Sequence, residues 1–406
     1  MRYSVTENQA ECCGCFACAS VCPVGAISMK PDKEGCIYPV IDTDKCIECG
    51  LCEKTCTINK PITKFCGGGY SARNQTAYAL RYIDENQRDM SASGGAFSAI
   101  AEICFDTHPK CVVFGAAWVE NNKVQHIAVE RKEELYLLRK SKYVQSEIGD
   151  AYIKCKKYLN DGFFVVFSGT PCQIAGLKSY LGKDYDSLLT IDIVCHGTPP
   201  AWVLEFYVNS IEKRYGRKVK NITFRYKKKD LLGTTQSKKI LIELDNNKKI
   251  VQSARKNYYL RGFQIALFYR SVCYDCKYAT QLRVSDITLG DYWSIQDIVP
   301  GMIDTSGVSC VLVNSEEGDA VFESLMNKNE YSLEIKETSI DFLYKHNGLL
   351  CAPIEKHKQR DRFMELLQQT DFCEAIDLTL GKRNKVKTTI LDLMPYKVFY
   401  SLRRFF

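Results

Sequence analysis

The sequence lacks the features that would place the chain in a membrane or mark it for export. No apolar run reaches the length of about 18 residues that a membrane-spanning helix needs. The first residues, MRYSVTENQAECC, have neither the basic segment nor the apolar segment of a secretory signal. We therefore expect a cytoplasmic protein, and its 406 residues predict two or three domains at about 150 residues each.

The chain also has little net charge outside its last residues. The formal net charge is +7, but residues 382–406 contain seven Lys or Arg and one acidic residue. The rest of the chain has a net charge close to zero and lacks the excess of basic residues that binds nucleic acid, so we expect no nucleic-acid partner. The apolar side chains of residues 387–406 recur at three- and four-residue intervals, which predicts a basic amphipathic tail. Such a tail either makes a peripheral contact with the inner face of the membrane or docks on protein.

Cysteine is abundant instead, with 21 residues. Without an export signal, so many thiols favour metal sites in a reducing compartment over disulfides. Two runs share the spacing C-x2-C-x2-C-x3-C, and they consist of Cys12, Cys15, Cys18 and Cys22 and of Cys46, Cys49, Cys52 and Cys56. A pair of zinc ribbons is the alternative, but zinc sites favour two separated CxxC pairs.

This spacing is the bacterial ferredoxin pattern, in which three thiolates hold one 4Fe-4S cluster and the fourth holds the other cluster. The pattern predicts two ligand sets: the Cys12 set (Cys12, Cys15, Cys18 and Cys56) and the Cys46 set (Cys46, Cys49, Cys52 and Cys22). Residues 1–62 are therefore predicted to form a ferredoxin-type electron-transfer domain. Because exposed clusters are sensitive to oxygen, we expect the protein to work under anaerobic conditions.

Beyond this segment, strand and helix patterns alternate. Apolar and β-branched runs predict strands at 111–119, 124–129, 163–167, 188–194, 219–226, 240–244 and 307–313. Helical periodicity predicts a helix over 201–215. The predicted fold class is α+β: the ferredoxin-like domain, a larger α/β domain with a mixed sheet over 70–350, and a helical extension with the basic tail over 351–406.

Four further cysteines have contexts that suit a third site, and we call them the central set: Cys172, Cys195, Cys273 and Cys276. The first two follow predicted strands, where open α/β sheets usually bind ligands. The other two form a CxxC pair. Glycine and proline in the turns let the backbone approach a bulky group closely. From the residues alone, an iron–sulfur cluster, structural zinc and unrelated buried thiols remain open.

Several short strings occur in an order that resembles the beta-subunit family of coenzyme F-420 hydrogenases and dehydrogenases. They are SASGG at 91–95, KSKYVQS at 140–146, GTPCQ at 169–173, CHG at 195–197, the CxxC at 273–276 and GDYW at 290–293. The resemblance covers roughly residues 70–350, and the fused two-cluster segment is similar to F-420H2 dehydrogenase subunits. It implies that the central set holds a 4Fe-4S cluster beside an FAD. Ser294 departs from the pattern, because many relatives have glycine there.

A small-residue turn is the candidate site for the flavin pyrophosphate. Ser93, Gly94 and Gly95 precede the helical run 96–105, and a helix that starts after such a turn presents N–H groups and a positive dipole end. The alternative is an ordinary helix cap with a flexible turn.

A basic segment follows as a second candidate for flavin binding. Lys142, with Arg139 and Lys140, could supply positive charge to a phosphate or to a reduced flavin, and Tyr143 could stack on a ring. The alternative is a solvated basic turn.

Two polar residues are candidates for catalysis. Asp291 follows a strand-like segment, so it could hydrogen-bond to the flavin or to a cluster loop, or it could cap a turn. His196, next to Cys195, has a side chain whose usual pKa suits proton relay. A hydrogen-bonded structural histidine is its alternative.

Together these patterns predict an iron–sulfur flavoprotein oxidoreductase. A flavin would exchange hydride with F-420 or another organic substrate, and ferredoxin-type clusters would carry single electrons to a redox partner protein or ferredoxin. One alternative is a ferredoxin-dependent reductase in a biosynthetic pathway, since some relatives are linked to surface-polysaccharide synthesis. Others are a non-catalytic electron-transfer subunit and a zinc-stabilised binding protein.

Overall fold

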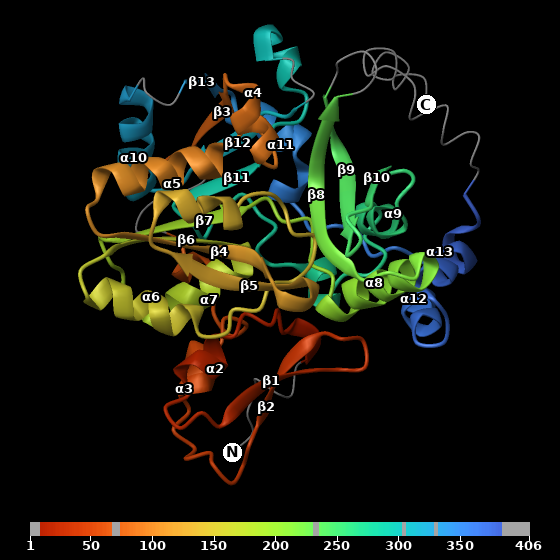
Figure 1. Cartoon of the computed structure of the whole chain (residues 1–406). Coiled ribbons are helices and arrows are strands. Elements are labelled where there is room, and N and C mark those ends of the chain that lie inside the picture. Colours follow the sequence, from red (N-terminus) through yellow and green to blue (C-terminus); the bar gives the residue numbers. More distant parts are fainter. Residues whose placement is uncertain (1–8, 67–73, 230–234, 303–305, 329–331, 384–406) are drawn as a thin grey trace.

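The computed structural model describes residues 9–66, 74–229, 235–302, 306–328 and 332–383. They form a small N-terminal unit with a two-stranded sheet, an eight-stranded mixed sheet flanked by helices, and a three-stranded sheet packed with the last helices (Figure 1). Most of the predicted basic tail lies outside the described residues. No helix in the described ranges is both long and apolar enough to cross a bilayer.

The N-terminal unit consists of two short helices and one antiparallel hairpin. Their bounds are α2 Ala17–Val21, β1 Ile27–Pro31, β2 Ile37–Ile41 and α3 Leu51–Thr55. Each helix starts after a left-handed residue, Phe16 with φ 68° and Gly50 with φ 69°, and each ends at a cysteine. The two cysteine runs therefore adopt the same loop-and-helix shape, as their identical spacing predicts.

The large sheet has the strand order β13-β3-β12-β11-β7-β6-β4-β5. Its four central strands, β11, β7, β6 and β4, run parallel, and antiparallel strands close both edges. The bounds are β3 Thr76–Tyr82, β4 Cys111–Val119, β5 Lys123–Val129, β6 Phe164–Gly169, β7 Leu188–Ile193, β11 Ile287–Asp291, β12 Ser309–Val313 and β13 Leu333–Thr338. The parallel strands are apolar and buried because helices cover both faces of the sheet.

Helices on the two faces produce two separate core layers. One face carries α5 (Ala96–Thr107) and α10 (Glu316–Asn327), and the other carries α6 (Ala151–Asn160) and α7 (Pro171–Leu181) (Figure 1). Two shorter helices, α4 Glu85–Met90 and α11 Ile340–His346, contact strand β3. Short 3-10 helices are η1 Gln9–Glu11, η2 Ile62–Lys64, η4 Glu120–Asn122, η5 Lys132–Leu137, η6 Ser271–Asp275, η7 Ile295–Asp297, η8 Pro300–Met302 and η10 Gly348–Leu350.

The three-stranded sheet has the order β10-β9-β8 and its own core. Its elements are α8 Ala201–Tyr215, β8 Val219–Lys229, β9 Thr235–Leu244, β10 Lys249–Ser253, α9 Tyr258–Gln264, α12 Arg360–Leu367 and α13 Phe372–Leu380. Aromatic side chains dominate this core. The ring centroids of Tyr207, Tyr259 and Phe372 lie 5.4 to 6.1 Å from one another. The last described helices thus belong to the same packed layer as α8 and β8, rather than extending away from it.

The mixed sheet and the predicted elements are confirmed in outline. Strand β4 and helix α8 have the predicted bounds, and the other predicted strands are each found within a few residues at both ends, apart from β9, which begins five residues earlier. The edge strand β13 and its neighbour β3 were not predicted. Strand β3 pairs with both β13 and β12, which are distant in sequence, and a local pattern does not reveal such pairing.

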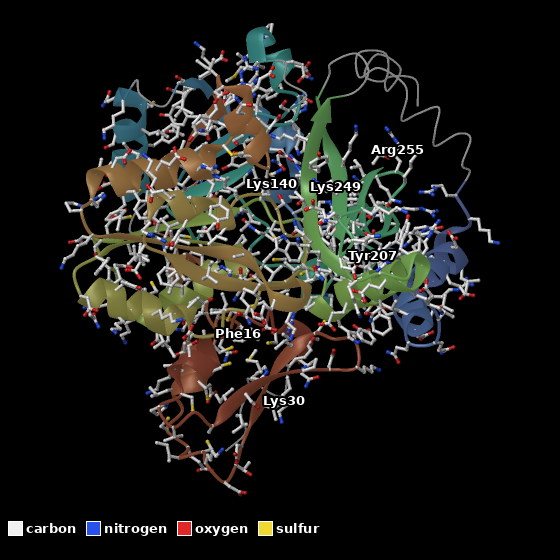
Figure 2. The ribbon with its side chains drawn as sticks, in the orientation of Figure 1. Phe16, Lys30, Lys140, Tyr207, Lys249 and Arg255 are labelled. Carbon is white, nitrogen blue, oxygen red and sulfur yellow. The ribbon has the colours of Figure 1, made fainter. Side chains whose placement is uncertain are left out.

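The N-terminal unit docks against the helix layer formed by α6 and α7. Phe16 lies where the two parts meet, whereas Lys30 lies on the far hairpin (Figure 2). Ser179 of α7 accepts a bond from Lys60 at 2.8 Å and donates to the carbonyl of Thr55 at 2.6 Å. Residues from both cysteine runs are therefore held against the helices α6 and α7 of the large domain.

Candidate functional site

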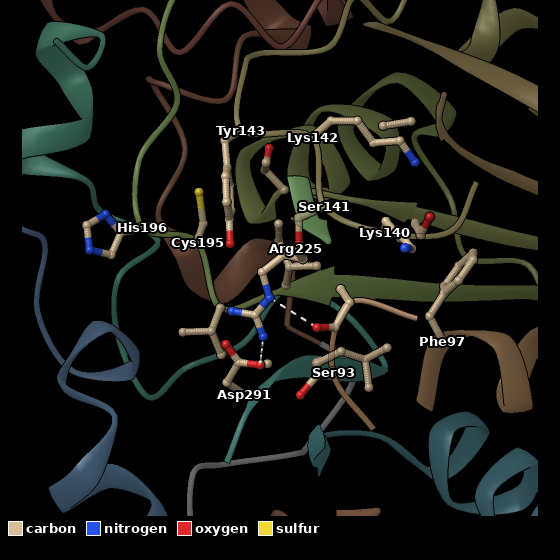
Figure 3. Close-up of a pocket in the computed structure, with 18 of the residues that line it drawn as sticks. Ser93, Phe97, Lys140, Ser141, Lys142, Tyr143, Cys195, His196, Arg225 and Asp291 are labelled. Atoms are coloured by element: carbon tan, nitrogen blue, oxygen red, sulfur yellow. Dashed lines mark hydrogen bonds and ion pairs between the residues drawn. The ribbon is translucent and has the colours of Figure 1, made fainter. Parts of the chain in front are cut away.

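A cavity of about 500 Å³ lies at the carboxyl ends of the central parallel strands. Strand β6 contributes Ser168 and Gly169, the segment after β7 contributes Cys195, and β11 contributes Asp291 (Figure 3). This is the edge where open α/β sheets bind ligands, because loops diverge there and leave a crevice. The volume falls in the range of cofactor sites.

The glycine turn forms one wall of the cavity. A Cβ on Gly94 would collide with the carbonyl oxygen of Leu80, and Gly95 has φ 104°, so only glycine fits both positions. The Ser93 hydroxyl donates to the carbonyl of Val308 at 3.0 Å and fixes the turn to β12. Helix α5 starts directly after this turn, and its first residues line the cavity.

Strand β8 supplies an arginine that faces the cavity and that the sequence patterns did not single out. Arg225 has φ 56° at an irregularity of the β8–β9 pairing, so its side chain leaves the sheet. Its guanidinium binds the Asp291 carboxylate at 2.6 Å and donates to the Ala92 carbonyl at 3.0 Å (Figure 3). Asp291 therefore forms an ion pair and does not cap a helix: the cap of the following η7 is Ser294.

The predicted basic segment is only partly solvated. Lys142 donates to the carbonyls of Leu138 at 2.9 Å and Arg139 at 2.7 Å, and burial lowers the pKa of Lys142 to about 7. Arg139 forms an ion pair with Glu102 at 3.0 Å, so its charge is neutralised away from the cavity. Only part of the segment thus remains available to a bound anion.

Tyr143 contributes an aromatic wall. Its ring stacks on Phe263 with a centroid distance of 4.3 Å and also contacts Phe224 at 5.1 Å. Arg225 lies beside the Tyr143 hydroxyl, and this interaction helps to raise the pKa of the guanidinium although burial alone would lower it.

Two histidines line the cavity in different surroundings. His126 is buried between the Ser168 carbonyl at 2.9 Å and the Ser146 hydroxyl at 3.1 Å, and burial lowers its pKa to about 4. His196 contacts the Tyr269 hydroxyl through Nδ1 at 2.5 Å, and burial also lowers its pKa. Both rings are therefore neutral at physiological pH.

The central set gathers on the side of the cavity that faces the N-terminal unit. Cys172 follows Pro171 at the start of α7, Cys195 follows β7, and Cys273 and Cys276 come from η6 and the residue after it. Cys195 interacts electrostatically with Cys273 and Cys276, and Cys172 does so with Cys276. Cys172 and Cys195 also line the cavity, so this set borders it directly.

The surroundings of the central set suit an iron–sulfur cluster. The N–H groups of Gly197 and Thr198 donate to Cys195 and Cys273, and the Thr170 hydroxyl lies 3.2 Å from the Cys172 sulfur. Such bonds stabilise thiolates on a cluster. In the described ranges, no three Cys, His, Asp or Glu side chains converge to hold a single metal ion.

Contacts among the N-terminal cysteines join the two runs. Cys18 interacts electrostatically with Cys12 and Cys56 and less strongly with Cys52, and Cys52 interacts with Cys22 and Cys46. A small cavity has all four members of the Cys46 set in its lining. Among these thiols Cys49 is exposed, so the Cys46 set lies at the solvent end of the unit and the Cys12 set lies toward the large domain.

One cysteine that the spacing leaves unassigned lies at the junction of two sets. The Cys13 sulfur hydrogen-bonds with Cys15 and Cys172, and these bonds lower the pKa of Cys13. The Cys13 carbonyl accepts a bond from the Gln145 side chain at 3.1 Å. Its position places the Cys12 set beside the central set, a proximity that the sequence did not predict.

Two parts of the chain match models of known protein families. Residues 164–339 match the family model for the C terminus of the coenzyme F420 hydrogenase/dehydrogenase beta subunit, and residues 11–59 match the 4Fe-4S dicluster domain. A solved structure entitled xenon derivatization of the F420-reducing NiFe hydrogenase complex from Methanosarcina barkeri aligns with 79% of this chain and 94% of that one, with 14% identity and a TM-score of 0.40. No curated protein matches the chain.

The dicluster match gives the N-terminal unit two 4Fe-4S clusters and a role in electron transfer. The larger match covers β6 through β13, which include part of the cavity lining and all four members of the central set. The chain is therefore an oxidoreductase that is similar to the beta subunits of coenzyme F420 hydrogenases and dehydrogenases over residues 164–339, and it carries a 4Fe-4S dicluster domain at its N-terminal side.

Proposed function

We propose that the protein is an iron–sulfur flavoprotein that moves electrons between an organic substrate at the cavity and a redox partner at the exposed end of the N-terminal unit. The observation that carries this proposal is the cavity itself, which is bordered by the glycine turn on one side and by Cys172 and Cys195 on the other. A cofactor in the cavity would thus contact the central set directly.

In this proposal the Cys12, Cys46 and central sets each hold one 4Fe-4S cluster. Residues 1–62 act as the electron-transfer domain and 70–350 as the domain for flavin and substrate. The crossed contacts of Cys56 and Cys22 support the division of the N-terminal ligands. The backbone N–H groups that donate to Cys195 and Cys273 support the third cluster.

The glycine turn and the start of α5 would hold the flavin pyrophosphate, and Lys142 is a buried cation that lines the same cavity. Bound flavin, as FAD, would supply the step between two-electron hydride chemistry and single-electron transfer. Arg225 keeps the turn in place through the Ala92 carbonyl, and Asp291 holds Arg225 in turn. The face of Tyr143 that lines the cavity is available for ring contact.

His196 is the candidate for proton movement. The Tyr269 hydroxyl donates to the Phe263 carbonyl, so it can only accept from His196 Nδ1. This arrangement leaves Nε2 of the neutral ring as an acceptor. His196 can therefore take up a proton at Nε2 when substrate is oxidised and return it in the reverse direction.

The cavity walls favour an anionic substrate. The cationic side chains in the described lining are Arg139, Lys140, Lys142, Arg225 and Lys239, and two of them are paired, Arg139 with Glu102 and Arg225 with Asp291. Asp291 is the only carboxylate in this lining, so positive charge is in excess. The family match makes F420 the first candidate, and another anionic organic substrate would suit the same walls. The redox partner would be a ferredoxin or another protein of a larger assembly, docked at the exposed end of the N-terminal unit.

A ferredoxin-dependent reductase is the second candidate, and the exposed Cys49 favours it. Electrons would then enter at the Cys46 set from a carrier protein and leave at the cavity. A non-catalytic subunit would have the same clusters but would not turn over small molecules.

Anaerobic purification with iron, sulfide and flavin analysis tests the proposal. We expect about twelve irons and one flavin per chain, because three clusters carry four irons each. Reduced F420 should bleach the flavin if F420 is the substrate, and reduced ferredoxin should bleach it if the second candidate holds. Eight irons would remove the central cluster, and zinc in place of iron would overturn the proposal.

A further inference from the structure

Arg270 connects the central set to the Cys12 set. Its backbone N–H bonds to the Thr198 carbonyl at 3.1 Å, and its carbonyl accepts from the Cys273 N–H at 2.9 Å. Its side chain points the other way and donates to the carbonyls of Cys12 at 2.7 Å and Ile37 at 2.8 Å. One residue thus spans the gap between two cysteine loops from different parts of the chain.

The fit around this guanidinium is tight. A Cβ on Gly14, which lies between Cys12 and Cys15, would meet Arg270 Nη1 at 2.9 Å. The ring of Tyr38 lies 4.3 Å from the guanidinium carbon, and Gln145 Oε1 lies 3.3 Å from Nη1. With 1% of its surface exposed, Arg270 is among the most buried charged side chains of the protein.

The groups that could balance the charge of Arg270 differ from those around most other buried arginines. Arg225, Arg283 and Arg360 each pair with a carboxylate, and Arg88 donates to the carbonyls of Tyr82 and Ile83. The groups that most favour the charged form of Arg270 are Cys12, Cys36, Tyr38 and Cys13, and none of them is a carboxylate. A buried cation is costly unless a negative charge compensates it. The thiolates of a loaded Cys12 set would provide that negative charge.

We propose that Arg270 is a positioning residue for electron transfer between the central set and the Cys12 set, and that its buried charge makes the cluster on the Cys12 set the easier of the two to reduce. This inference rests on the proposed function. In the transfer step the central cluster is oxidised by one electron and the Cys12 cluster is reduced by one. The Cys12 cluster gains one negative charge, which the adjacent guanidinium stabilises without any proton transfer.

Arg360 provides a matched control. It is also buried and also holds the N-terminal unit, through two bonds to Glu34 at 2.9 and 2.6 Å and one to the Tyr269 carbonyl at 3.1 Å. Its charge is neutralised by Glu34. An Arg360→Met variant therefore removes a docking contact of similar kind without removing the charge beside Cys12.

The test is a redox titration followed by EPR on anaerobically purified wild type, Arg270→Met, Arg270→Lys and Arg360→Met, each with about twelve irons. At a potential that half-reduces the wild-type Cys12 cluster, we expect the reduced-to-oxidised ratio to fall at least ten-fold in Arg270→Met. Arg270→Lys should keep a ratio near wild type, and Arg360→Met should not change it.

A second variant tests the same inference with Arg270 in place, in case Arg270→Met does not fold. Gln145→Glu keeps the side-chain shape and places a carboxylate beside Arg270, so it should lower the same ratio by neutralising the charge. An unchanged ratio in Gln145→Glu, or equal shifts in Arg270→Met and Arg360→Met, would overturn the inference. An iron content of eight in wild type would instead overturn the proposed function, so the two failures are distinguishable.

Discussion

The N-terminal unit and the large domain build their thiol sites in opposite ways. All eight cysteines of the Cys12 and Cys46 sets lie between residues 12 and 56. They belong to two similar segments, each made of a loop followed by a short helix. The central set comes from three segments between residues 172 and 276, and it exists only when β6 and β7 lie side by side. The ligands of the N-terminal sites are close in sequence, so these sites can form once the N-terminal unit folds. The central site forms only when the large sheet has brought its three segments together.

The two regions also differ in their access to solvent. Cys49 is exposed at the end of the N-terminal unit, whereas the central set lies between that unit and the cavity. The outer set therefore suits exchange with a partner, and the inner set suits transfer within the protein. Variants in each region should separate these roles.

The largest expected effect comes from Cys195→Ser. Removing one ligand of the central set should lower the iron content from about twelve to about eight per chain and leave the two N-terminal clusters intact. Cys351→Ser changes an exposed cysteine outside all three sets and is the control. Iron analysis with EPR of the reduced proteins measures this effect. Twelve irons in Cys195→Ser would contradict the assignment.

A smaller effect is expected when the ion pair of the cavity is broken. Arg225→Leu leaves the partly buried Asp291 without its partner and releases the Ala92 carbonyl, so the free energy of unfolding should fall by about 3 kcal/mol. Urea denaturation measures this change, and flavin content should fall with it. Lys249→Met, on the exposed strand β10, is the control, and equal losses in both variants would disprove a specific role for Arg225.

The pH dependence of flavin binding tests Lys142. Burial lowers the pKa of Lys142 to about 7, and a bound phosphate would raise it. Binding then takes up a proton above pH 7, so flavin affinity should be constant below that pH and fall by up to about ten-fold per unit above it. Burial lowers the pKa values of His126 and His196, so both rings remain neutral there.

The measurement is flavin titration of the apoprotein between pH 6 and 9, which brackets the pKa of about 7. Lys142→Met should bind flavin more weakly at pH 6 and show a flat profile. If flavin affinity in Lys142→Met fell with pH as steeply as in wild type, a group other than Lys142 would cause the pH dependence.

The smallest effect concerns the loop after β11. Ser294 has φ 60°, a left-handed conformation that glycine adopts without strain and other residues adopt at a cost of about 1 kcal/mol. Ser294→Gly should therefore stabilise the protein by about 0.5 to 1 kcal/mol in thermal or urea unfolding. A loss of stability would show that the serine side chain makes up for the strain.

The sequence could predict the features that depend on residues close together in the chain, but it could not predict those that depend on contacts between distant segments. The spacing from Cys12 to Cys56 predicts the crossed sets without knowledge of the fold, and apolar runs predict the parallel strands. For the central set, the contexts of the cysteines left the kind of site open, and the family resemblance indicated a cluster. Ser294 was singled out by the same resemblance, and its φ of 60° shows that the position has the backbone shape of a glycine.

Arg225 and Arg270 could not be predicted, because a single arginine in a strand or before a CxxC has no periodic signal. Arg225 acquires its role from an irregularity in the β8–β9 pairing, and Arg270 acquires its role from the docking of the N-terminal unit. Cys13 does not fit the three-residue spacing of the cysteine runs, yet the same docking places its sulfur beside Cys172. Contacts between distant segments determine all three.

The most direct test of the account follows electrons from the cavity to the N-terminal unit. Anaerobic protein is mixed with a donor that reduces the flavin, and rapid-freeze EPR monitors the N-terminal clusters in wild type and Cys195→Ser. We predict that their reduced signals appear as the flavin reoxidises in wild type and are at least about 100-fold slower in Cys195→Ser, which lacks the intermediate cluster. Equal rates in the two proteins would contradict a path through the central set.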